Sequence, residues 1–445
     1  MQLIQKDNKK IINAWIFYDW ANSVYPLIIS SAIFPILYEI KTSIKDPISG
    51  KTTYDIISFL GMEFKNTEFY AYLVSLSYII VAILSPILSG MADAGGKRKF
   101  FMQFFCYMGA IASGLLYFFS ADNHGIENTP FELGITILPL FIGSIGFWGS
   151  LVYYNSYLPE IADYKEHDKI SARGFSMGYL GSSCLLIIIL VLTVFTKTIP
   201  INFAFPLVSL WWIVFATYSF YYLPKTKKSV KNSHNNLFFS GFKELSKVAV
   251  EIRGNLHLRR FLGSYFMYNM AVQTIMVMAV AFANKEIIGI KSDDLIISIL
   301  IIQFLGIAGA FLMSKISSII GNIKTIGISI LIWISLCIFV FMFVYEPWQF
   351  YIAAAVVGLV MGGIQSVSRS TYSKLLPETN DLTSYFSFFD LAEKIGLAIG
   401  TFTFGIIEGY LDIRSSILAL IAFFVAGFIM LFFVPKSDRL ISSDR

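Results

Sequence analysis

Long apolar blocks, each about twenty residues or more, constrain this chain more than any other feature of its sequence. They follow one another with short polar segments between them, and they lack the alternation of a segment that is half exposed to water. Hydrophobic residues make up 56% of the chain and charged residues only 14%, which is too few to cover such a core in water. The sequence therefore predicts an all-α integral membrane protein with lipid as its main solvent.

Twelve apolar blocks bounded by charge predict twelve transmembrane helices. Those of the first half span 12–38, 70–92, 98–119, 130–157, 173–196 and 200–223. Those of the second half span 259–284, 293–317, 324–344, 348–373, 383–409 and 413–435. The polar stretch between the two sets divides the chain into a six-helix bundle at 1–223, a linker at 224–258 and a second six-helix bundle at 259–445.

The linker carries a pattern typical of an amphipathic helix. Apolar residues recur there at helical spacing: Leu237, Phe238, Phe242, Leu245, Ala249 and Ile252. Charged residues take the opposite face: Lys243, Glu244, Lys247 and Glu251. We expect a helix that lies at the membrane interface, with a disordered linker as the alternative.

Basic residues set the expected orientation, because Lys and Arg are enriched in the cytoplasmic loops of membrane proteins. Most of the 34 Lys and Arg residues fall on the side of the N-terminus when the chain crosses the membrane at each block. Both termini and the linker are therefore expected in the cytoplasm, with 39–69 as the largest external loop, in the cell (inner) membrane. The net charge of +5 then comes from basic residues that orient the protein in the lipid membrane, and no nucleic-acid partner is expected.

Local sequences that match between the halves indicate a duplicated, pseudo-symmetric architecture. Gly96 follows the second block and Gly321 the eighth. Pro159 follows the fourth block and Pro377 the tenth. Each pair has a similar separation along the chain, which favours one duplication of a six-helix unit.

The loop between the second and third blocks carries Asp93, Gly96, Lys97 and Arg98. Its glycine permits a tight turn, and its charges can clamp neighbouring helices in one conformational state. We expect these four residues to control conformation and not to bind solute. The counterpart in the second half begins with Ser317 instead of an acid, which leaves its gating role open.

This loop resembles the signature of the major facilitator superfamily between its second and third helices. Segments 13–23, 155–162, 173–181 and 362–370 are similar to the branch that contains the fungal vacuolar amino-acid effluxer linked to autophagy. The resemblance covers both halves and implies two six-helix bundles that move solute by alternating access. It also implies efflux of amino acids or small peptides.

The first block carries the strongest candidate site. An ionisable residue at the centre of a span costs about 2.5–3.5 kcal/mol on insertion scales, so it should face a cavity or a partner. Trp15, Asp19, Asn22 and Pro26 are spaced to share one helical face. We expect this face to line a central cavity with a kink at Pro26, and a purely structural pairing is the alternative for Asp19.

Neutral hydrogen-bonding groups complete the expected solute site. Tyr154 and Asn155 lie in the fourth block, Asn269 and Gln273 in the seventh, and Gln365 in the tenth. Aromatic packing and hydrogen bonds between helices are the alternative roles for these residues.

Charged residues late in the chain are candidates for binding and coupling. Arg369 suits a carboxylate of the solute, with a gate or an interface anchor as its alternative. Asp390 and Lys394 are four residues apart and can pair, which leaves Glu393 as the unpaired acid. Alternatively, Lys394 reaches Asp19 and bridges the halves. Coupling to a proton is expected to use Asp19, Asp390 or Glu393.

The remaining sequence excludes several functions. No Gly-x-x-x-x-Gly-Lys-Ser/Thr element is present, so ATP hydrolysis is not expected. The 3 cysteines lie in separate blocks and the 4 histidines in predicted loops, so we expect no metal site and no cofactor. The expected function is secondary transport of a small polar solute by a monomer, and not enzymatic catalysis. A membrane-embedded lipid-linked transferase and a solute sensor without transport are the alternatives.

Overall fold

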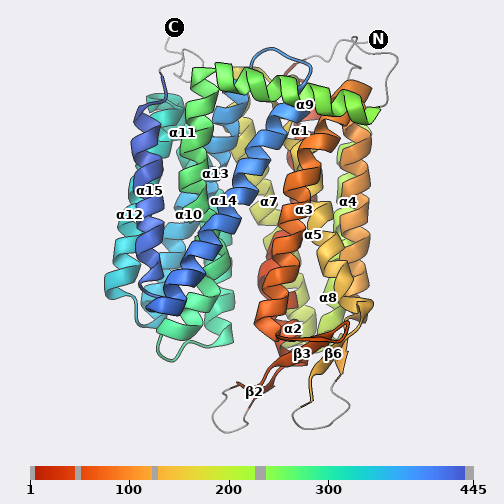
Figure 1. The fold of residues 1–445 in the computed structure, drawn as a ribbon, viewed down its shortest axis with the longest axis vertical. Coiled ribbons are helices and arrows are strands. Elements are labelled where there is room, and N and C mark those ends of the chain that lie inside the picture. Colours follow the sequence, from red (N-terminus) through yellow and green to blue (C-terminus); the bar gives the residue numbers. More distant parts are fainter. Residues whose placement is uncertain (1–5, 46–51, 123–128, 226–236, 436–445) are drawn as a thin grey trace.

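The computed structural model describes residues 6–45, 52–122, 129–225 and 237–435. Two groups of long helices stand side by side, and one further helix lies across one end of both (Figure 1). The start of α1 and the end of α15 both lie at that same end.

The first group contains two π-helical segments in addition to regular helices. The α-helices are α1 (Lys9–Asn22), α2 (Ile33–Thr42), α3 (Asn66–Gly95), α4 (Arg98–Leu115), α5 (Leu138–Asn155), α6 (Leu158–Ile161), α7 (His167–Leu190) and α8 (Ala204–Tyr222). The π-helices are η1 (Tyr25–Ala32) and η5 (Val191–Phe195), and single 3₁₀ turns are η2 (Leu116–Phe118), η3 (Ile135–Ile137), η4 (Tyr164–Glu166) and η6 (Ile201–Phe203).

The second group is built from α-helices alone. They are α10 (Leu256–Glu286), α11 (Ser292–Ile320), α12 (Asn322–Phe343), α13 (Pro347–Leu375), α14 (Leu382–Tyr410) and α15 (Ser416–Phe432). The helix that crosses the end of both groups is α9 (Leu237–Gly254). This helix is the one predicted in the linker, whereas its contact with a membrane surface stays a prediction.

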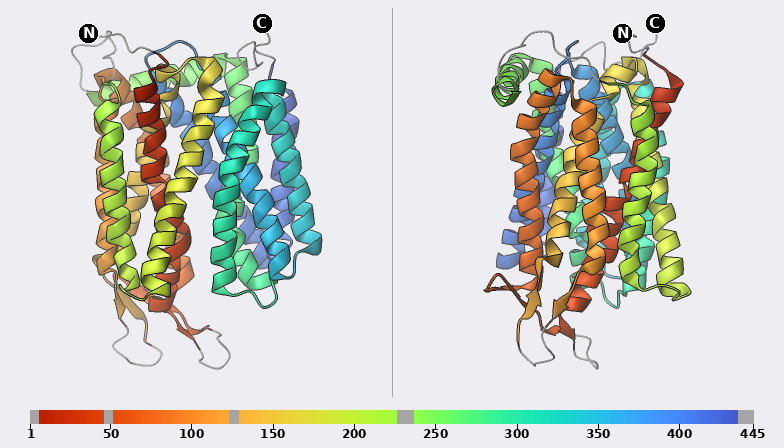
Figure 2. Two further views of the ribbon diagram at one scale, coloured as in Figure 1. Left: turned by 180° about the vertical axis from the view of Figure 1, so that it is seen from behind. Right: turned by 90° about the vertical axis from the view of Figure 1, so that its right-hand side faces the viewer.

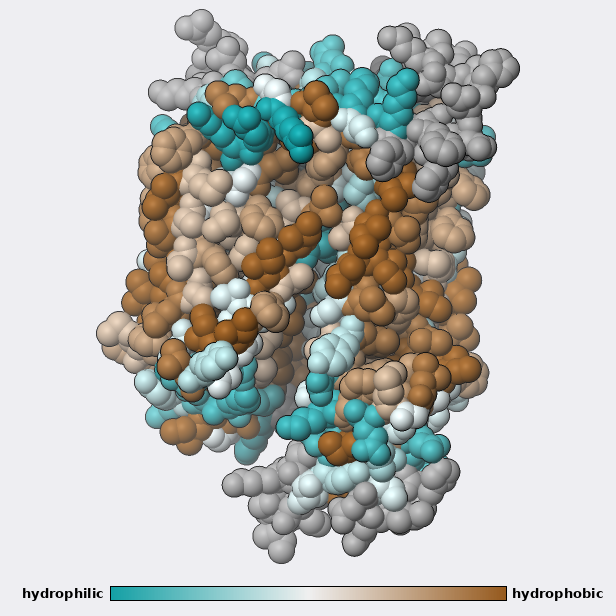
Figure 3. All heavy atoms as spheres, viewed as in Figure 1, coloured by the Kyte–Doolittle hydropathy of each residue, from teal (hydrophilic) through white to brown (hydrophobic). Residues whose placement is uncertain are grey.

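Ten helical segments of the described chain are long and apolar enough to cross a membrane, as expected for a multi-pass membrane protein. Helix α15 is shorter, at 17 residues, and α14 has 29 residues but includes Asp390, Glu393 and Lys394. Apolar residues cover the middle of the molecule and polar residues gather at both ends (Figure 3). The count of twelve spans and the side of each terminus stay predictions.

Pro26 lies where the first span changes its helix type. It occupies the first turn of η1, directly after the end of α1. Because proline has no backbone N–H, it cannot continue the α-helical hydrogen-bond ladder, and a π-helical stretch replaces it here. The structure thus has a change of helix type at Pro26, and the kink predicted there stays a prediction.

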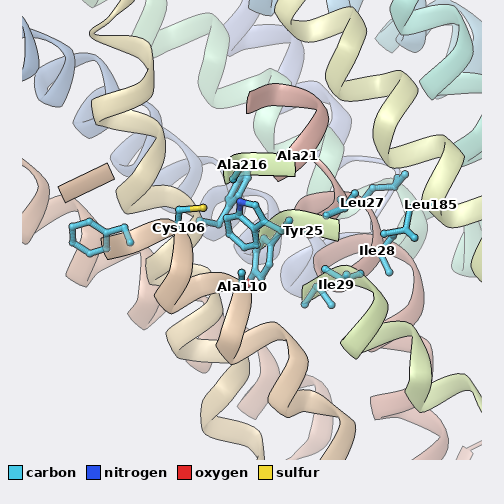
Figure 4. Close-up of a cluster of buried hydrophobic side chains, with 14 of the residues drawn as sticks. Ala21, Tyr25, Leu27, Ile28, Ile29, Cys106, Ala110, Leu185 and Ala216 are labelled. Carbon is cyan, nitrogen blue, oxygen red and sulfur yellow. The ribbon is translucent and has the colours of Figure 1, made fainter. Parts of the chain in front are cut away.

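Buried apolar side chains form a separate large cluster in each half, one between Ile12 and Leu223 and one between Val248 and Val434. Figure 4 shows part of the first, where Tyr25 of η1 faces Cys106 and Ala110 of α4. Cys106 packs here as a small apolar residue, and all three cysteines are free thiols, in keeping with the sequence prediction.

Short strands in the loops opposite α9 were not predicted from the sequence. They are β1 (Ile44–Lys45), β2 (Thr52–Tyr54), β3 (Ile56–Phe59), β4 (Met62–Lys65), β5 (Ala121–Asp122) and β6 (Phe131–Leu133). Four of them form a sheet in the order β4-β3-β6-β5, in which β3 and β6 are parallel. Ile57 on β3 is fully buried opposite Phe131, but strands of two to four residues are too short to give a clear alternating pattern.

Two helix pairs make the most extensive contacts between the halves. Helix α3 packs against α14 at the front of the molecule (Figure 1), and α7 packs against α11 at the back (Figure 2). Gly96 closes α3 with a φ of 63° and Gly321 closes α11 with a φ of 88°, so the two glycines matched in sequence occupy equivalent helix junctions.

Candidate binding cavity between the two halves

A cavity of about 740 Å³ lies between the two groups of helices. Its walls come from α1, η1, α2, α3, α5 and α7 of the first half and from α10, α11, α12, α13, α14 and α15 of the second. It extends from Asp19 and Arg369 inside the molecule to Glu39 and Asn66 beside the strands. The space-filling view shows a furrow between the halves that widens toward the strands (Figure 3). The end away from α9 is thus the open end.

Most of the predicted solute and coupling residues line this cavity. They are Asp19, Asn22, Asn155, Asn269, Gln273, Gln365, Arg369, Asp390 and Glu393. Trp15, Tyr154 and Lys394 do not, because each is buried behind the wall. Trp15 donates from Nε1 to the Tyr154 carbonyl over 2.9 Å and stacks on the Tyr154 ring at 4.6 Å. These two aromatic residues support the cavity and do not reach its interior.

Arg369 forms the floor of the cavity and joins α13 to three helices of the first half. Its Nη1 lies 3.4 Å from the Asp19 carboxylate and donates to Asn155 over 3.3 Å. Its Nε and Nη2 donate to the hydroxyl and carbonyl of Ser171 over 3.0 and 2.9 Å. Tyr154 donates to the same Asp19 oxygen over 2.6 Å. The arrangement is a hydrogen-bonded contact between the halves, and the predicted roles of Arg369 as a solute ligand, a gate or an interface anchor stay predictions.

Asp390 and Glu393 of α14 lie in the cavity wall that the second half forms. Lys394 Nζ lies 3.2 Å from Asp390 and 3.5 Å from Glu393. Glu393 also accepts hydrogen bonds from Tyr265 at 3.3 Å and Gln273 at 3.2 Å. The prediction that Glu393 is unpaired is therefore wrong, and so is the alternative that Lys394 reaches Asp19, because side chains of the second half hold both groups.

Several buried polar atoms in the cavity wall have no hydrogen-bond partner. They are Asn22 Nδ2, Asn269 Nδ2, Gln303 Oε1 and Asp390 Oδ2. An unsatisfied buried polar group costs about 1–3 kcal/mol. The four residues line one chamber from α1, α10, α11 and α14, with these atoms buried at its wall.

The predicted gating loop closes the end that α9 covers. Asp93 accepts hydrogen bonds from the backbone N–H and the hydroxyl of Ser384 over 2.7 and 2.9 Å, at the N-terminus of α14. That terminus favours a negative charge. Arg98 donates to Thr383 over 2.9 Å and to Glu160 over 2.5 Å. Gly96 forms the turn, whereas Lys97 is exposed to solvent.

A second carboxylate contact at this end was missed from the sequence. Asp168 accepts hydrogen bonds from Lys374 at 2.6 Å, Ser370 at 2.6 Å, Asn322 at 2.7 Å and Ser317 at 3.2 Å. The predicted fifth span began at 173 and thus assigned Asp168 to a loop, although α7 begins at His167. A charged pair at two span ends on the same side of the membrane was the signal that could have revealed it.

Helix α9 contacts α14 from outside this closed end. Lys247 donates to Glu244 over 2.8 Å and to Asp381 over 2.9 Å, and Tyr385 donates to Glu251 over 2.6 Å. The hydrogen bonds to Glu244 and Asp381 raise the pKa of Lys247. The linker therefore stabilises the same junction as Asp93.

Within the described residues, no group of three His, Cys, Asp or Glu side chains has a geometry suited to a metal ion. His167 was assigned to a loop, but it opens α7 and is buried against Ser373, with 3.0 Å between Nδ1 and the hydroxyl. His124 and His234 lie outside the described residues.

Comparison with known proteins identifies relatives along nearly the whole chain. The model of the family described as "Vacuole effluxer Atg22 like" matches residues 7–439. An uncharacterized MFS-type transporter, YxiO, of Bacillus subtilis is 29% identical over 95% of this chain and 94% of its own length. Autophagy-related protein 22 of Coccidioides immitis is 24% identical over 97% of this chain and 88% of its own length.

Solved structures share the fold. The human organic anion transporter MFSD10 matches with a TM-score of 0.70 and 12% identity, over 96% of this chain and 100% of that one. The major facilitator superfamily transporter FucP in the outward conformation matches with a TM-score of 0.66 and 15% identity, over 96% and 99% of the two chains. The overall arrangement of helices is therefore that of major facilitator transporters.

Proposed function

Because the chain belongs to the Atg22-like vacuole effluxer family of the major facilitator superfamily, we propose that it carries a small polar solute across the membrane by alternating access. The transport is secondary, and the solutes are amino acids or small peptides that leave the compartment on the α9 side. The two halves rock about the cavity, and the described conformation has it open at the opposite end.

The placement of buried polar groups carries this proposal. Asp390, Asn22 and Asn269 line one chamber between the halves, and each has a buried polar atom without a hydrogen-bond partner. The contacts of Asp93, Asp168 and Arg369 close that chamber at one end only. A site that is reached from one side at a time is the property that alternating access requires.

We place the closed end in the cytoplasm of a cell with the protein in its inner membrane. Basic residues on and beside α9 support this orientation, among them Lys247, Arg253 and Arg259. The two bundles, at 1–223 and 259–445, are joined by the linker at 224–258. Together they act as a monomer surrounded by lipid.

Protonation of a cavity acid is the proposed coupling step. Asp19 faces Arg369 and Tyr154, so a proton on Asp19 would weaken the contact that closes the cavity floor. Glu393 and Asp390 face Lys394, and Glu393 also faces Tyr265. A proton at any of the three acids changes the charge of a group that links helices around the cavity.

A flux assay tests the proposal. Purified protein in liposomes should show counterflow of an amino acid or a small peptide, with a rate that depends on pH. Asp19→Asn should retain counterflow and lose part of the pH dependence. Unaltered pH dependence in the variant would remove Asp19 from the coupling role.

The same preparation separates the two alternative functions. Turnover of a lipid-linked substrate without solute flux would favour a membrane-embedded transferase. Solute binding without counterflow would favour a sensor.

A further inference from the structure

The charges that face the cavity are unequal in its two walls. On α14, Asp390 and Glu393 contribute two carboxylates and Lys394 one ammonium, so the ionised cluster has an excess negative charge. Both acids line the cavity, whereas Lys394 lies behind them, with its Nζ 3.5 Å from the centre of the Trp148 ring. The negative groups are therefore presented to a solute and the positive group is not.

One oxygen of this cluster lacks any partner. Asp390 is only 7% exposed, and its Oδ2 accepts no hydrogen bond. The other Asp390 oxygen is the one near Lys394. A buried carboxylate oxygen without a donor is costly, and a cationic group in the cavity that Asp390 lines would compensate the charge of this carboxylate.

Arg369, the candidate partner for an anionic solute group, is already committed. Four hydrogen bonds to Asp19, Asn155 and Ser171 use all three of its nitrogens. The guanidinium also lies 4.2 Å from the Phe175 ring centre and 4.8 Å from that of Trp15. A bidentate pair between a solute carboxylate and Arg369 would compete with these bonds, since they occupy four of the five N–H donors.

The rest of the wall suits an apolar body. Phe147, Trp148 and Phe389 line the cavity together with many aliphatic residues. The ring of Tyr265 stacks on Phe389 at 4.1 Å, next to the acid cluster, since the Tyr265 hydroxyl donates to Glu393. Rigid aromatic faces beside carboxylates favour an organic cation, through apolar contact and cation–π attraction.

We propose that the cavity recognises its solute by an ammonium group, held by Asp390 and Glu393, with the apolar part of the solute against the aromatic wall. A carboxylate on the solute contributes little to recognition, because Arg369, the cationic side chain among the described lining residues, is held by the first half. Recognition therefore depends on the ammonium group that amino acids, small peptides and primary amines share, and a free amino acid binds more weakly than the matching amine. This inference rests on the proposed function in taking the cavity as the solute site.

Three probes with the same indole body test the inference on the purified full chain. Tryptamine is a cation, tryptophan a zwitterion and indole-3-propionate an anion near neutral pH. Calorimetric titration should give a Kd for tryptamine at least about tenfold below that for tryptophan, and no binding of indole-3-propionate. Equal or tighter binding of tryptophan or of the anion overturns the inference, as does the absence of tryptamine binding.

Paired variants of α14 locate the binding group. Glu393→Gln and Asp390→Asn should each raise the Kd for tryptamine by at least about tenfold, because each removes one of the two carboxylates. Glu408→Gln is the matched control, since Glu408 lies on the same helix, pairs with Lys285 and is absent from the cavity wall. Unchanged affinity in both test variants overturns the inference.

Counterflow in liposomes separates this inference from the proposed function. Tryptamine binding without movement of any solute would leave the ammonium site standing and refute transport. Counterflow of tryptophan that is unaffected by Glu393→Gln would leave transport standing and refute the ammonium site.

Discussion

Two buried carboxylates, Asp93 and Asp168, connect the halves at the end that α9 covers, and they do so in different ways. Asp93 accepts from the N-terminus of α14, where the donors are the backbone N–H groups of Thr383 and Ser384 and the Ser384 hydroxyl, and its nearest cation, Arg98 Nη2, lies 3.9 Å away. Asp168 accepts from the ammonium of Lys374 and from an amide and hydroxyls of α11, α12 and α13. The first contact is mainly a capped helix end with a long ion pair of 3.9 Å, and the second is a close buried ion pair of 2.6 Å.

The comparison shows that the two halves of a duplicated fold can make equivalent contacts with the acidic residue on different helices. In the second half, the position that corresponds to the Asp93 loop holds Ser317, which has no charge. Ser317 still reaches a carboxylate, because Asp168 of α7 provides one from the facing helix. Both acids thus belong to the first half, and each interface retains one acid with its donors.

Asp168→Asn is expected to have the largest effect, because it leaves the buried Lys374 ammonium without a counter-charge. Removal of one partner of a buried pair costs about 3–5 kcal/mol. We expect the closed end to open and a Ser156→Cys reporter, buried between the halves, to react faster with a membrane-impermeant maleimide. The double variant Asp168→Asn/Lys374→Met should recover most of the protection. Equal labelling of both variants would show that Lys374 does not depend on Asp168.

Gly174→Ala tests the deeper contact at the cavity floor. A Cβ at this position would lie 2.5 Å from Asp19 Oδ2 and 2.9 Å from Arg369 Nη2, so one of them must shift. Overpacking of this kind costs about 1–3 kcal/mol. We therefore expect a lower thermal unfolding temperature and easier opening of the cavity at the end that α9 covers. Gly405→Ala is the control, since a Cβ there meets nothing within 4 Å. Similar unfolding temperatures for both variants would contradict a tight floor.

Asp93→Asn should weaken the closed end less than Asp168→Asn. The amide oxygen can still accept from Ser384, and Arg98 keeps Glu160 as a counter-charge, so the main loss is the negative charge at the N-terminus of α14, about 0.3–2 kcal/mol. Maleimide labelling of Ser156→Cys should rise, but by less than in Asp168→Asn. A reversed order of the two variants would refute the distinction between the capped helix end and the ion pair.

Lys247→Ala is expected to have the smallest effect, because the Lys247 side chain is 52% exposed. Exposed ion pairs contribute about 0–1 kcal/mol, and salt screens them. Glu244 and Asp381 raise the pKa of Lys247, so its contribution is complete below the ordinary lysine pKa and is lost only at higher pH. The difference in unfolding temperature between variant and parent should be constant from about pH 6 to 9 and shrink in high salt. A difference that grows as the pH rises through this range would contradict the assignment.

Residue spacing predicted part of the candidate site correctly. Asp19, Asn22 and Pro26 share a face by helical periodicity, and all three line the cavity. Trp15 belongs to the same face by spacing, yet it lies behind the wall, because α5 packs over it and Tyr154 stacks on its ring. Periodicity assigns a residue to one side of a helix, but the neighbouring helices decide which part of that side a ligand can reach.

The ion pairs that join the two halves could not be predicted from the sequence, unlike the pair within α14. The four-residue spacing of Asp390 and Lys394 indicated their pairing, which the structure contains. The partner of Asp19 is Arg369, 350 positions away in the chain, and that of Asp168 is Lys374, 206 positions away. No local pattern encodes contacts between helices of different halves, since they depend on how the halves pack.

The sequence by itself determined that this chain is a multi-pass helical membrane protein of the major facilitator type, because long apolar blocks and local signatures are properties of single segments. The tertiary structure decided which polar residues line the cavity and which ones close it. It also decided that Arg369 is hydrogen-bonded to the first half, whereas one oxygen of Asp390 has no hydrogen-bond partner. These outcomes follow from packing between distant helices, where a buried charge has a free-energy cost that depends on the nearest opposite charge.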